Sequence, residues 1–299
     1  MKIQYNSEVT DALKQDLPIV ALESTVISHG LPYPLNIKTA KRMEDTVREH
    51  GAVPATIAVL GGIPTVGLTE DQLALLAGSE NTRKISTRDL PVVIGKEVNC
   101  ATTVATTMFF AWKAGIDVFA TGGIGGVHRG DGSDVSADLP AIAGIPITTV
   151  CAGAKSVLDL SATREWLETN GVCVVGWRTS EFPAFYSESS GLEVDEKVDS
   201  ATEVARIINA RDRLGLDSCV LLTVPVPESD SIEAAEIDDW LSRALQEASE
   251  RGIKGKETTP FLLSRLVEFS DGKTLDANIA LLINNAGVAA KVAVELNRK

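Results

Sequence analysis

A lysine stands where a buried strand is expected to end. Lys155 follows the apolar, β-branched run ITTVCAGA, which predicts a strand running into a turn. A lysine amine is a nucleophile only when neutral, and an ordinary pKa of about 10.4 leaves roughly 1 amine in 2,500 neutral at pH 7. Apolar surroundings and a second cation favour the neutral form, and Lys84 in RKIS is a candidate for that cation. Covalent catalysis by Lys155 is one interpretation of this position. The alternatives are an amine that extends to solvent or one that binds phosphate without covalent chemistry.

Four further segments place polar side chains where expected strands end: ESTVISHG, KISTRD, TGGIGGVHRGDGSDVSADL and GKETTPF. Ligands of open α/β sheets bind at the carboxyl ends of the strands. Glu23 lies at the end of LPIVALES and could give or take a proton, with its pKa raised if it is partly desolvated. A carboxylate that caps a turn or pairs with a lysine is the alternative.

The glycine-rich segment TGGIGG could let backbone amides approach a ligand, as in loops that bind phosphate. Its spacing fits neither the dinucleotide-binding G-x-G-x-x-G pattern nor the P-loop. A tight turn or close strand packing is the alternative. His128 and Arg129 follow directly, and both can hold an anion.

Two carboxylates and a hydroxyl follow within SDVSADL. Asp134 and Asp138 are four residues apart with Ser136 between them. Such a set could hold a hard divalent ion and leave water to complete its shell, as Mg²⁺ or Mn²⁺ tolerates. The alternative is an N-cap pair that begins a short helix over residues 137–143.

Composition excludes several classes of partner. The chain has 299 residues, with 28 Lys+Arg against 41 Asp+Glu and a formal net charge of -13, which argues against nucleic acid and anionic membrane. The four cysteines show no C-x-x-C spacing and no Cys/His cluster typical of zinc. The first ten residues lack the apolar region of a signal peptide, and no apolar run approaches the ~20 residues of a membrane span. We therefore expect a cytoplasmic, soluble protein with reduced thiols.

Short β-branched runs alternate with helical patterns, which predicts a three-layer α/β/α fold with a mixed, largely parallel central sheet. We expect one domain over residues 1–299. Asn36 is the expected N-cap of a helix over 36–51, and Thr69 with Gln72 forms a capping box before a helix over 70–78. The expected strands are 17–24, 53–60, 83–86, 91–95, 116–123, 144–155, 171–177 and 218–227. The remaining expected helices are 101–115, 161–171, 201–215, 233–252, one after Pro260 and one from about Thr274.

Taken together, these segments resemble the pseudouridine-5′-phosphate glycosidase family. The resemblance is carried by VALESTVISHGLPYP, GAVPATIAVLGGIPTVGL, FATGGIGGVHRG, DVSADL, VCAGAKSVLDL and GKETTPFLL with NIALLINNA. It extends from about residue 15 to the C-terminal helix, and the order of the segments is more specific than any one of them.

The resemblance implies reversible cleavage of pseudouridine 5′-phosphate to uracil and ribose 5-phosphate, with Mn²⁺ as cofactor and a homotrimer as assembly. It further implies that Lys155 is the nucleophile, Glu23 the proton donor and Asp134 the metal ligand. The substrate contacts that it implies are Lys84, Val104, Thr121, His128, Ser136, Ala137, Asp138 and Asn278.

Two departures from the family pattern are visible. The GDGS loop between Arg129 and Asp134 is a little shorter than in the family, which bears on the surroundings of the metal rather than on its aspartate, and Val224 stands where many members have Asn before the first proline. Two other functions fit the residues: a Schiff-base aldolase acting on another phosphorylated sugar, and a non-catalytic module that binds phosphosugars or nucleotides.

Overall fold

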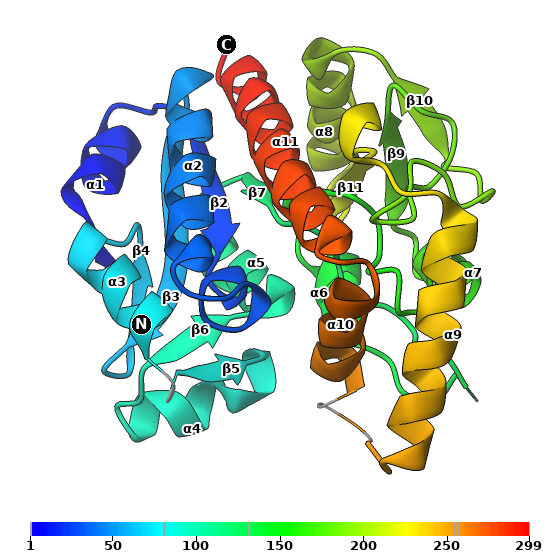
Figure 1. The fold of residues 1–299 in the computed structure, drawn as a ribbon. Coiled ribbons are helices and arrows are strands. Elements are labelled where there is room, and N and C mark those ends of the chain that lie inside the picture. The colour runs from blue at the N-terminus through cyan, green and yellow to red at the C-terminus, as the bar shows by residue number, and fades with distance from the viewer. Residues whose placement is uncertain (1, 80–81, 131, 254, 256–257, 299) are drawn as a thin grey trace.

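One sheet runs through the whole molecule (Figure 1). The computed structural model describes residues 2–79, 82–130, 132–253, 255 and 258–298. The 11-stranded sheet has the order β1-β4-β3-β2-β7-β8-β11-β9-β10, with β6 pairing to β3 and β5 beside this path. The strands are β1 (Gln4–Tyr5), β2 (Ile19–Glu23), β3 (Val53–Leu60), β4 (Ile63–Val66), β5 (Arg83–Ile85), β6 (Cys100–Thr102), β7 (Val118–Ala120), β8 (Thr148–Cys151), β9 (Cys173–Trp177), β10 (Glu196–Val198) and β11 (Val220–Thr223).

The pairing is mostly parallel. β3 pairs antiparallel with β4 and β6, whereas every other strand pairing is parallel among the described residues. The central strands β2, β7, β8 and β11 are buried along their whole length, as expected for parallel strands covered by helices on both faces.

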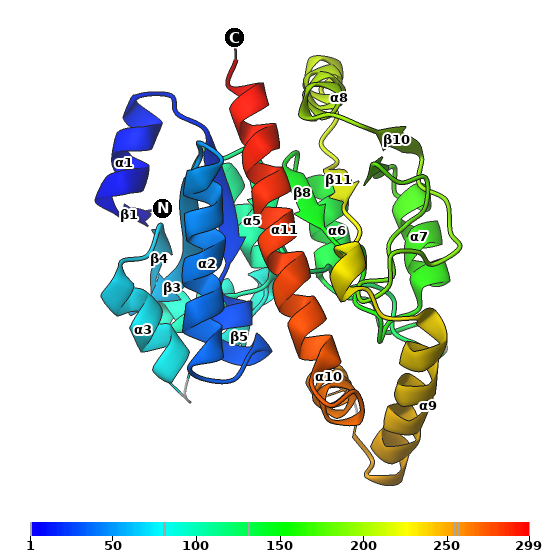
Figure 2. The same ribbon diagram turned by 45° about the horizontal axis from the view of Figure 1, so that its top comes forward.

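Helices cover both faces of the sheet (Figures 1 and 2). α2 and α11 lie in front of it in Figure 1, and α5 and α6 lie behind. The helices are α1 (Ser7–Lys14), α2 (Leu35–Glu49), α3 (Glu70–Gly78), α4 (Leu90–Gly95), α5 (Val104–Lys113), α6 (Asp138–Gly144), α7 (Leu160–Thr169), α8 (Ala201–Leu214), α9 (Ala234–Glu250), α10 (Thr258–Phe269) and α11 (Lys273–Leu296), with the short turns η1 (Val26–Gly30), η2 (Thr87–Asp89) and η3 (Glu228–Asp230). The predicted three-layer α/β/α fold is confirmed. That residues 1–299 form one domain stays a prediction.

Local signals predicted some boundaries well. Thr69 accepts a hydrogen bond from the backbone of Gln72 and receives one back, so the predicted capping box at the start of α3 is confirmed. The predicted strand over 91–95 is wrong: these residues lie in α4, with Pro91 in the first helical turn, where proline needs no N–H partner. A short apolar run does not distinguish strand from helix.

The expected N-cap role of Asn36 is also wrong. α2 begins at Leu35, and Asn36 is buried inside its first turn. Its side-chain amide donates hydrogen bonds to the carbonyl oxygens of Ile27 at 2.7 Å and Ala77 at 3.1 Å. Asn36 therefore ties η1 and the end of α3 to α2, which local sequence does not reveal.

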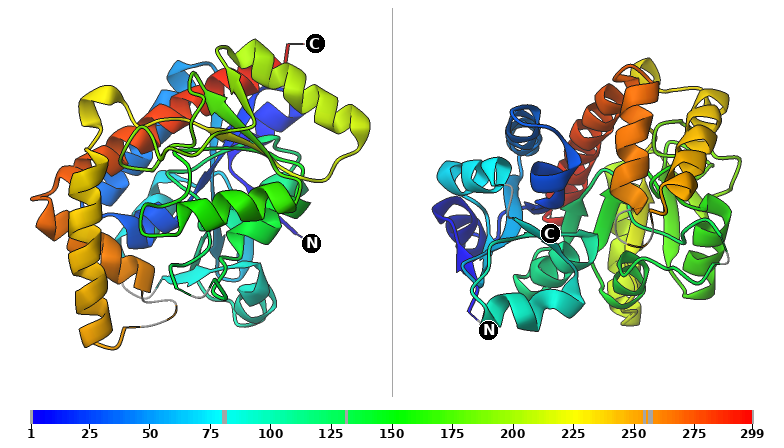
Figure 3. Two further views of the ribbon diagram at one scale, coloured as in Figure 1. Left: turned by 90° about the vertical axis from the view of Figure 1, so that its right-hand side faces the viewer. Right: turned by 60° about the horizontal axis from the view of Figure 1, so that its bottom comes forward.

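The C-terminal helix α11 passes through the core. Among the described residues it is the one helix that is long and apolar enough, by length and composition, to cross a membrane. The sequence expectation was that no apolar run approaches this length. However, 61% of the apolar window of α11 is buried inside the protein. α9 and α10 lie side by side next to the start of α11 (Figure 3), and Arg265 of α10 pairs with Glu247 of α9 at 2.9 Å.

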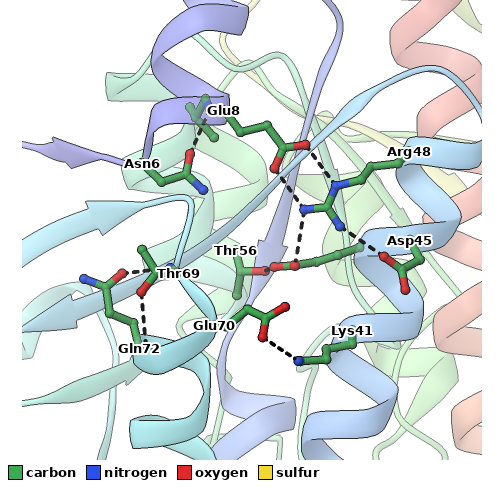
Figure 4. Close-up of polar contacts among 11 residues, drawn as sticks. Asn6, Glu8, Lys41, Asp45, Arg48, Thr56, Thr69, Glu70 and Gln72 are labelled. Atoms are coloured by element: carbon green, nitrogen blue, oxygen red, sulfur yellow. Dashed lines mark hydrogen bonds and ion pairs between the residues drawn. The ribbon is translucent and has the colours of Figure 1, made fainter.

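A polar cluster joins α1 to α2 at the edge of the sheet (Figure 4). The Arg48 guanidinium donates two hydrogen bonds of 2.9 Å to the Glu8 carboxylate. Beneath it, the buried carboxyl of Glu44 accepts a 2.6 Å hydrogen bond from the hydroxyl of Thr56 on β3. None of these four residues is among those predicted to do chemistry.

Candidate active site

Three neighbouring parallel strands bring the predicted acid and the predicted nucleophile to one edge of the sheet. β2 ends at Glu23, β7 is followed by Thr121, and β8 leads through residues 152–154 to Lys155. β7 pairs with both β2 and β8, so their carboxyl ends lie together. The hydroxyl of Thr121 donates a hydrogen bond to the carboxylate of Glu23. The structure thus assembles the edge that the sequence predicted.

Glu23 is a buried carboxyl, 7% exposed. Burial is the largest influence and raises its pKa, because desolvation disfavours the carboxylate. The charge of Lys155, the Thr121 hydrogen bond and the charge of Lys84 act in the opposite direction, while Asp138 raises the pKa further. The net rise favours a carboxyl that holds its proton, as a general acid requires.

Lys155 is half-buried on a turn held by the backbone. Its N–H donates to the carbonyl oxygen of Ile124 at 3.1 Å, and its own carbonyl accepts from Leu158 at 3.0 Å. Gly153 just before it has a φ of 79°, and a Cβ there would lie 2.2 Å from the carbonyl oxygen of Pro183. Only glycine fits that approach, so the CAGA segment fixes the path into Lys155.

Lys84 approaches from the other side of the sheet edge, on β5. Its side chain is open to solvent. Surrounding protein atoms and the like charge of Lys155 nevertheless lower its pKa, whereas Asp138 and Glu23 raise it. The predicted second cation therefore lies within electrostatic reach of Lys155.

The segment around Asp138 links two other loops of the site. Asp138 is the first residue of α6, and its two carboxylate oxygens accept hydrogen bonds from the N–H groups of Ala105 at 3.0 Å and Gly125 at 2.9 Å. Ala105 lies in the first turn of α5, where a helix favours a nearby anion. The Oγ of Ser136 accepts from the N–H of Asp138 at 3.2 Å. Asp138 thus fastens α5 and the glycine-rich loop rather than capping its own helix.

Two other predicted substrate contacts, Val104 and Ala137, lie at the starts of α5 and α6. Val104 is the buried first residue of α5, and Ala137 is exposed in the N-cap position of α6. The N–H of Thr103, before Val104, donates to the carbonyl of Ile85, after Lys84, at 3.2 Å. These contacts place the start of α5 beside β5.

The glycines of TGGIGG are sites of close packing. A Cβ on Gly125 would lie 2.1 Å from the Oγ of Ser136, and one on Gly126 would lie 2.3 Å from the Oγ1 of Thr163. The packing alternative considered for this segment therefore holds at both positions. Because the chain comes so close at Gly125, its N–H reaches the Asp138 carboxylate. The tight packing of this loop therefore also helps to build the site.

Asp134 and His128 lie on adjoining backbone. The N–H of His128 donates to the carbonyl oxygen of Asp134 at 2.9 Å; the His128 side chain is half-buried and that of Asp134 is exposed.

Within the described ranges, no three His, Cys, Asp or Glu side chains gather as a metal cluster. Both oxygens of Asp138 already bind amides. The residues present therefore fit an ion held by one carboxylate and completed by water, not a closed protein cage. Asp131 of the GDGS loop lies outside the described residues.

Asn278 lies in the first turns of α11, and its Oδ1 is 3.5 Å from the place a Cβ on Gly122 would take. It lines a cavity of about 400 Å³ between η1, α10 and α11. The other lining residues are Ser28, His29, Gly30, Leu31, Pro32, Tyr186, Pro260, Leu263, Ser264, Val267, Thr274 and Leu275. Of the predicted segment GKETTPF, Lys256 and Glu257 lie outside the described residues. A second cavity of about 170 Å³ lies at the amino ends of the strands and touches none of the predicted site residues.

Sequence reasoning missed one residue that shapes the site. Asn285 of α11 is fully buried, and its amide donates to the carbonyl oxygens of Thr121 at 2.8 Å and Gly122 at 3.3 Å. An asparagine inside an otherwise apolar helix was the available signal, because a buried amide must find partners.

The fold and the site together define an α/β protein with a lysine and a buried carboxylic acid at the carboxyl edge of a largely parallel sheet. The chain belongs to the family described as Indigoidine synthase A like protein, which it matches over residues 8–295. Two relatives named pseudouridine-5′-phosphate glycosidase come from Caldanaerobacter subterraneus subsp. tengcongensis and Escherichia coli. The first is 52% identical over 298 residues, covering 99% of this chain and 97% of the relative. The second is 48% identical over 299 residues, covering 99% and 96%. The family resemblance predicted from the motifs is confirmed.

Solved structures agree. The crystal structure of the prealnumycin C-glycosynthase AlnA in complex with ribulose 5-phosphate has a TM-score of 0.92 and 37% identity, covering 99% of this chain and 97% of that one. An indigoidine synthase A-like protein from Thermotoga maritima has a TM-score of 0.91 and 38% identity, with the same coverage.

Proposed function

We propose that this chain reversibly cleaves the C–C glycosidic bond of pseudouridine 5′-phosphate, giving uracil and ribose 5-phosphate. The observation that carries the proposal is the position of Glu23, buried and hydrogen-bonded to Thr121, within electrostatic reach of Lys155. The names of the relatives and the sugar phosphate bound to AlnA support the substrate class.

The carbon link explains why an amine is needed. A base joined through nitrogen can leave as a nitrogen anion behind an oxocarbenium-like sugar, with help from acid catalysis. Uracil joined through C5 has no such exit, so the bond must break toward an electron sink. Uracil protonated at C5 accepts the electron pair of the broken bond, and the nitrogen of a lysine bonded to C1′ supplies electrons to C1′, which becomes a protonated imine.

The steps follow from these roles. Glu23 protonates the ring oxygen of the ribose, the ring opens, and the Lys155 amine forms a bond to C1′. The proton lost from the nitrogen after it bonds to C1′ passes to C5 of uracil, the C1′=N bond of the imine forms as the C1′–C5 bond breaks, and uracil leaves. The imine remaining on Lys155 is hydrolysed by water, which releases ribose 5-phosphate and the free amine.

The remaining predicted residues would hold the substrate. Lys84, His128 and backbone amides would bind the 5′-phosphate. The other proposed contacts are Val104, Thr121, Ser136, Ala137, Asp138 and Asn278.

The exposed carboxylate of Asp134 would hold Mn²⁺ largely through water. Bound there, the ion would orient water and the loop of Ser136 and Asp138. A homotrimer and a cytoplasmic location stay predictions of the sequence, and the four cysteines are free thiols in this structure.

Mass spectrometry tests the covalent step directly. Protein incubated with pseudouridine 5′-phosphate or ribose 5-phosphate and then treated with borohydride should carry a pentose phosphate on the peptide containing Lys155. Lys155→Ala should lose cleavage and the adduct while substrate binding stays detectable. Lys38→Ala, an exposed change on α2, is the matched control.

Uracil release separates the candidate functions. A sugar-phosphate aldolase would form the adduct without releasing uracil from pseudouridine 5′-phosphate, and a non-catalytic binding module would do neither. Turnover that persists in Lys155→Ala would disprove the role of Lys155.

A further inference from the structure

A buried tyrosine in the wall of the larger cavity has a hydroxyl with no hydrogen-bond partner among the described residues. Tyr186 is 2% exposed and lines the cavity of about 400 Å³. Its ring packs edge-on against Phe185, with the ring centroids 4.7 Å apart. Burial raises the pKa of this phenol, so the group stays a neutral O–H donor.

The backbone around Tyr186 is fastened on both sides. The N–H of Phe185 donates to the carbonyl oxygen of Ala152 at 3.1 Å, directly after β8, and the carbonyl of Tyr186 accepts from Ile232 at 2.9 Å. The Phe185 ring also lies where a side chain on Gly123 would have to go, with its nearest atoms 2.6 Å from that Cβ position. The phenol is therefore held in place by the same segments that carry Thr121 and Lys155.

The chemistry of the cavity wall restricts what it can bind. The lining combines apolar side chains with neutral hydrogen-bonding groups, and no Asp, Glu, Lys or Arg is among its described residues. Such a wall would leave a phosphate without a counter-charge, but it suits a flat, neutral, polar heterocycle. Asn278, which offers both a donor and an acceptor, lies in the same wall and adjoins Gly122.

Taking the proposed function as its basis, we infer that Tyr186 donates its hydroxyl hydrogen to a carbonyl oxygen of the pyrimidine base and helps select a dioxopyrimidine. The hydroxyl is left to the cavity, so a ligand that fills the cavity and supplies an acceptor gains over one that displaces solvent from the O–H without replacing its hydrogen bond. The cationic end of the site, with Lys84 and Lys155, is left for the sugar phosphate.

Tyr186→Phe removes the hydroxyl and keeps the ring. We expect the KM for pseudouridine 5′-phosphate, and the KM for uracil in the synthetic direction, to rise about 10- to 100-fold. Borohydride trapping of ribose 5-phosphate on Lys155 should stay unchanged, because that step uses no base. Tyr33→Phe, at a tyrosine that is 70% exposed, is the matched control and should behave as wild type.

Base analogues give a readout that a merely structural role would not move. In the synthetic direction, wild-type protein should use uracil better than one of its two thio analogues. That analogue is the one, 2-thiouracil or 4-thiouracil, in which sulfur, a weaker acceptor, replaces the contacted oxygen. Tyr186→Phe should lose that preference at the same position.

The outcomes separate the two claims. Wild type that releases uracil, together with a Tyr186→Phe variant of unchanged KM and unchanged discrimination, overturns the inference alone. Equal use of uracil and both thio analogues by wild type also overturns it, independently of whether the variant folds. Wild type that releases no uracil overturns the proposed function on which the inference rests.

Discussion

The hydroxyl of Thr121 donates a hydrogen bond to the carboxylate of Glu23, joining the ends of the neighbouring strands β2 and β7. The bond favours the charged form of a carboxyl that burial otherwise keeps protonated. The pKa of Glu23 is therefore set by a balance between desolvation and its neighbours. Each neighbour can be removed separately, and the direction in which it shifts the pKa follows from its charge or hydrogen bond.

Thr121→Val should extend catalysis to higher pH. A general acid acts only while protonated, so cleavage falls as pH rises through the pKa of Glu23. Because the Thr121 hydrogen bond lowers that pKa, its loss should move the alkaline limb of the kcat/KM profile to higher pH. Glu23→Gln should remove both the limb and most of the activity. An alkaline limb unchanged in Thr121→Val would count against Glu23 as the titrating acid.

Asp138→Asn should move the same limb the other way. The charge of Asp138 raises the pKa of Glu23, so neutralising it should shift the limb to lower pH. The change also weakens the acceptor for the amides of Ala105 and Gly125, and we expect a loss of about 1–3 kcal/mol in the free energy of unfolding. Denaturant unfolding and the pH profile measure the two effects separately. A shift in the same direction as Thr121→Val would contradict the electrostatic account.

Gly125→Ala should damage the site through packing. The new Cβ would lie 2.1 Å from the Oγ of Ser136 and 2.8 Å from Asp138, so the loop must move away from both. We expect a loss of about 1–3 kcal/mol in stability and a fall of at least tenfold in kcat/KM. Gly144→Ala is the matched control, because a Cβ there has no neighbour within 4 Å. Equal behaviour of the two variants would show that close packing at Gly125 is unimportant.

Asp134→Asn tests the proposed metal ligand. Wild type treated with a chelator should lose activity and regain it on addition of Mn²⁺, whereas the variant should need a much higher Mn²⁺ concentration or show no response. Binding of Mn²⁺ to the protein without substrate, followed by its paramagnetic signal, gives a readout besides activity. Equal Mn²⁺ affinity in the two proteins would remove Asp134 from the proposal.

How far the sequence could predict the molecule depends on the range of the interactions. The capping box of Thr69 and Gln72 is formed by residues three apart, so its pattern is readable in the chain. Because ligands of parallel sheets bind at the carboxyl ends of the strands, the sequence predicts that Glu23 and Lys155 lie at the same edge. Tyr186, in contrast, lines the cavity together with residues of α10, and its neighbour Phe185 is bound to Ala152 after β8, which no local pattern predicts.

The same limit explains the errors. Asn36 has the residue type of an N-cap, but its amide partners at Ile27 and Ala77 lie 9 and 41 residues away. Asp138 begins the helix α6, as one alternative expected, but its carboxylate does not cap that helix and instead binds the amide of Ala105, 33 residues away. Polar side chains whose partners are distant in sequence are the ones that pattern reading misplaces.

Glu44 allows a test of buried charge outside the active site. Its carboxyl is 7% exposed, accepts a hydrogen bond from Thr56, and lies 3.6 Å from Arg48. Burial outweighs both partners and raises its pKa above the ordinary 4.5. The folded protein then holds this proton more tightly than the unfolded chain. The contribution of Glu44 to stability is therefore fully present below about pH 4.5 and is lost as pH rises through the folded pKa.

Glu44→Gln should remove this pH dependence while keeping an acceptor for the Thr56 hydroxyl. We expect the stability of wild type relative to Glu44→Gln, measured by urea unfolding at a series of pH values, to fall as pH rises above about 4.5. Asp45→Asn, at an exposed neighbour on the same helix that also pairs with Arg48, should follow wild type closely. If the stability of wild type instead rises relative to that of Glu44→Gln over this interval, the ion pair with Arg48, rather than desolvation, sets the direction of the Glu44 pKa shift.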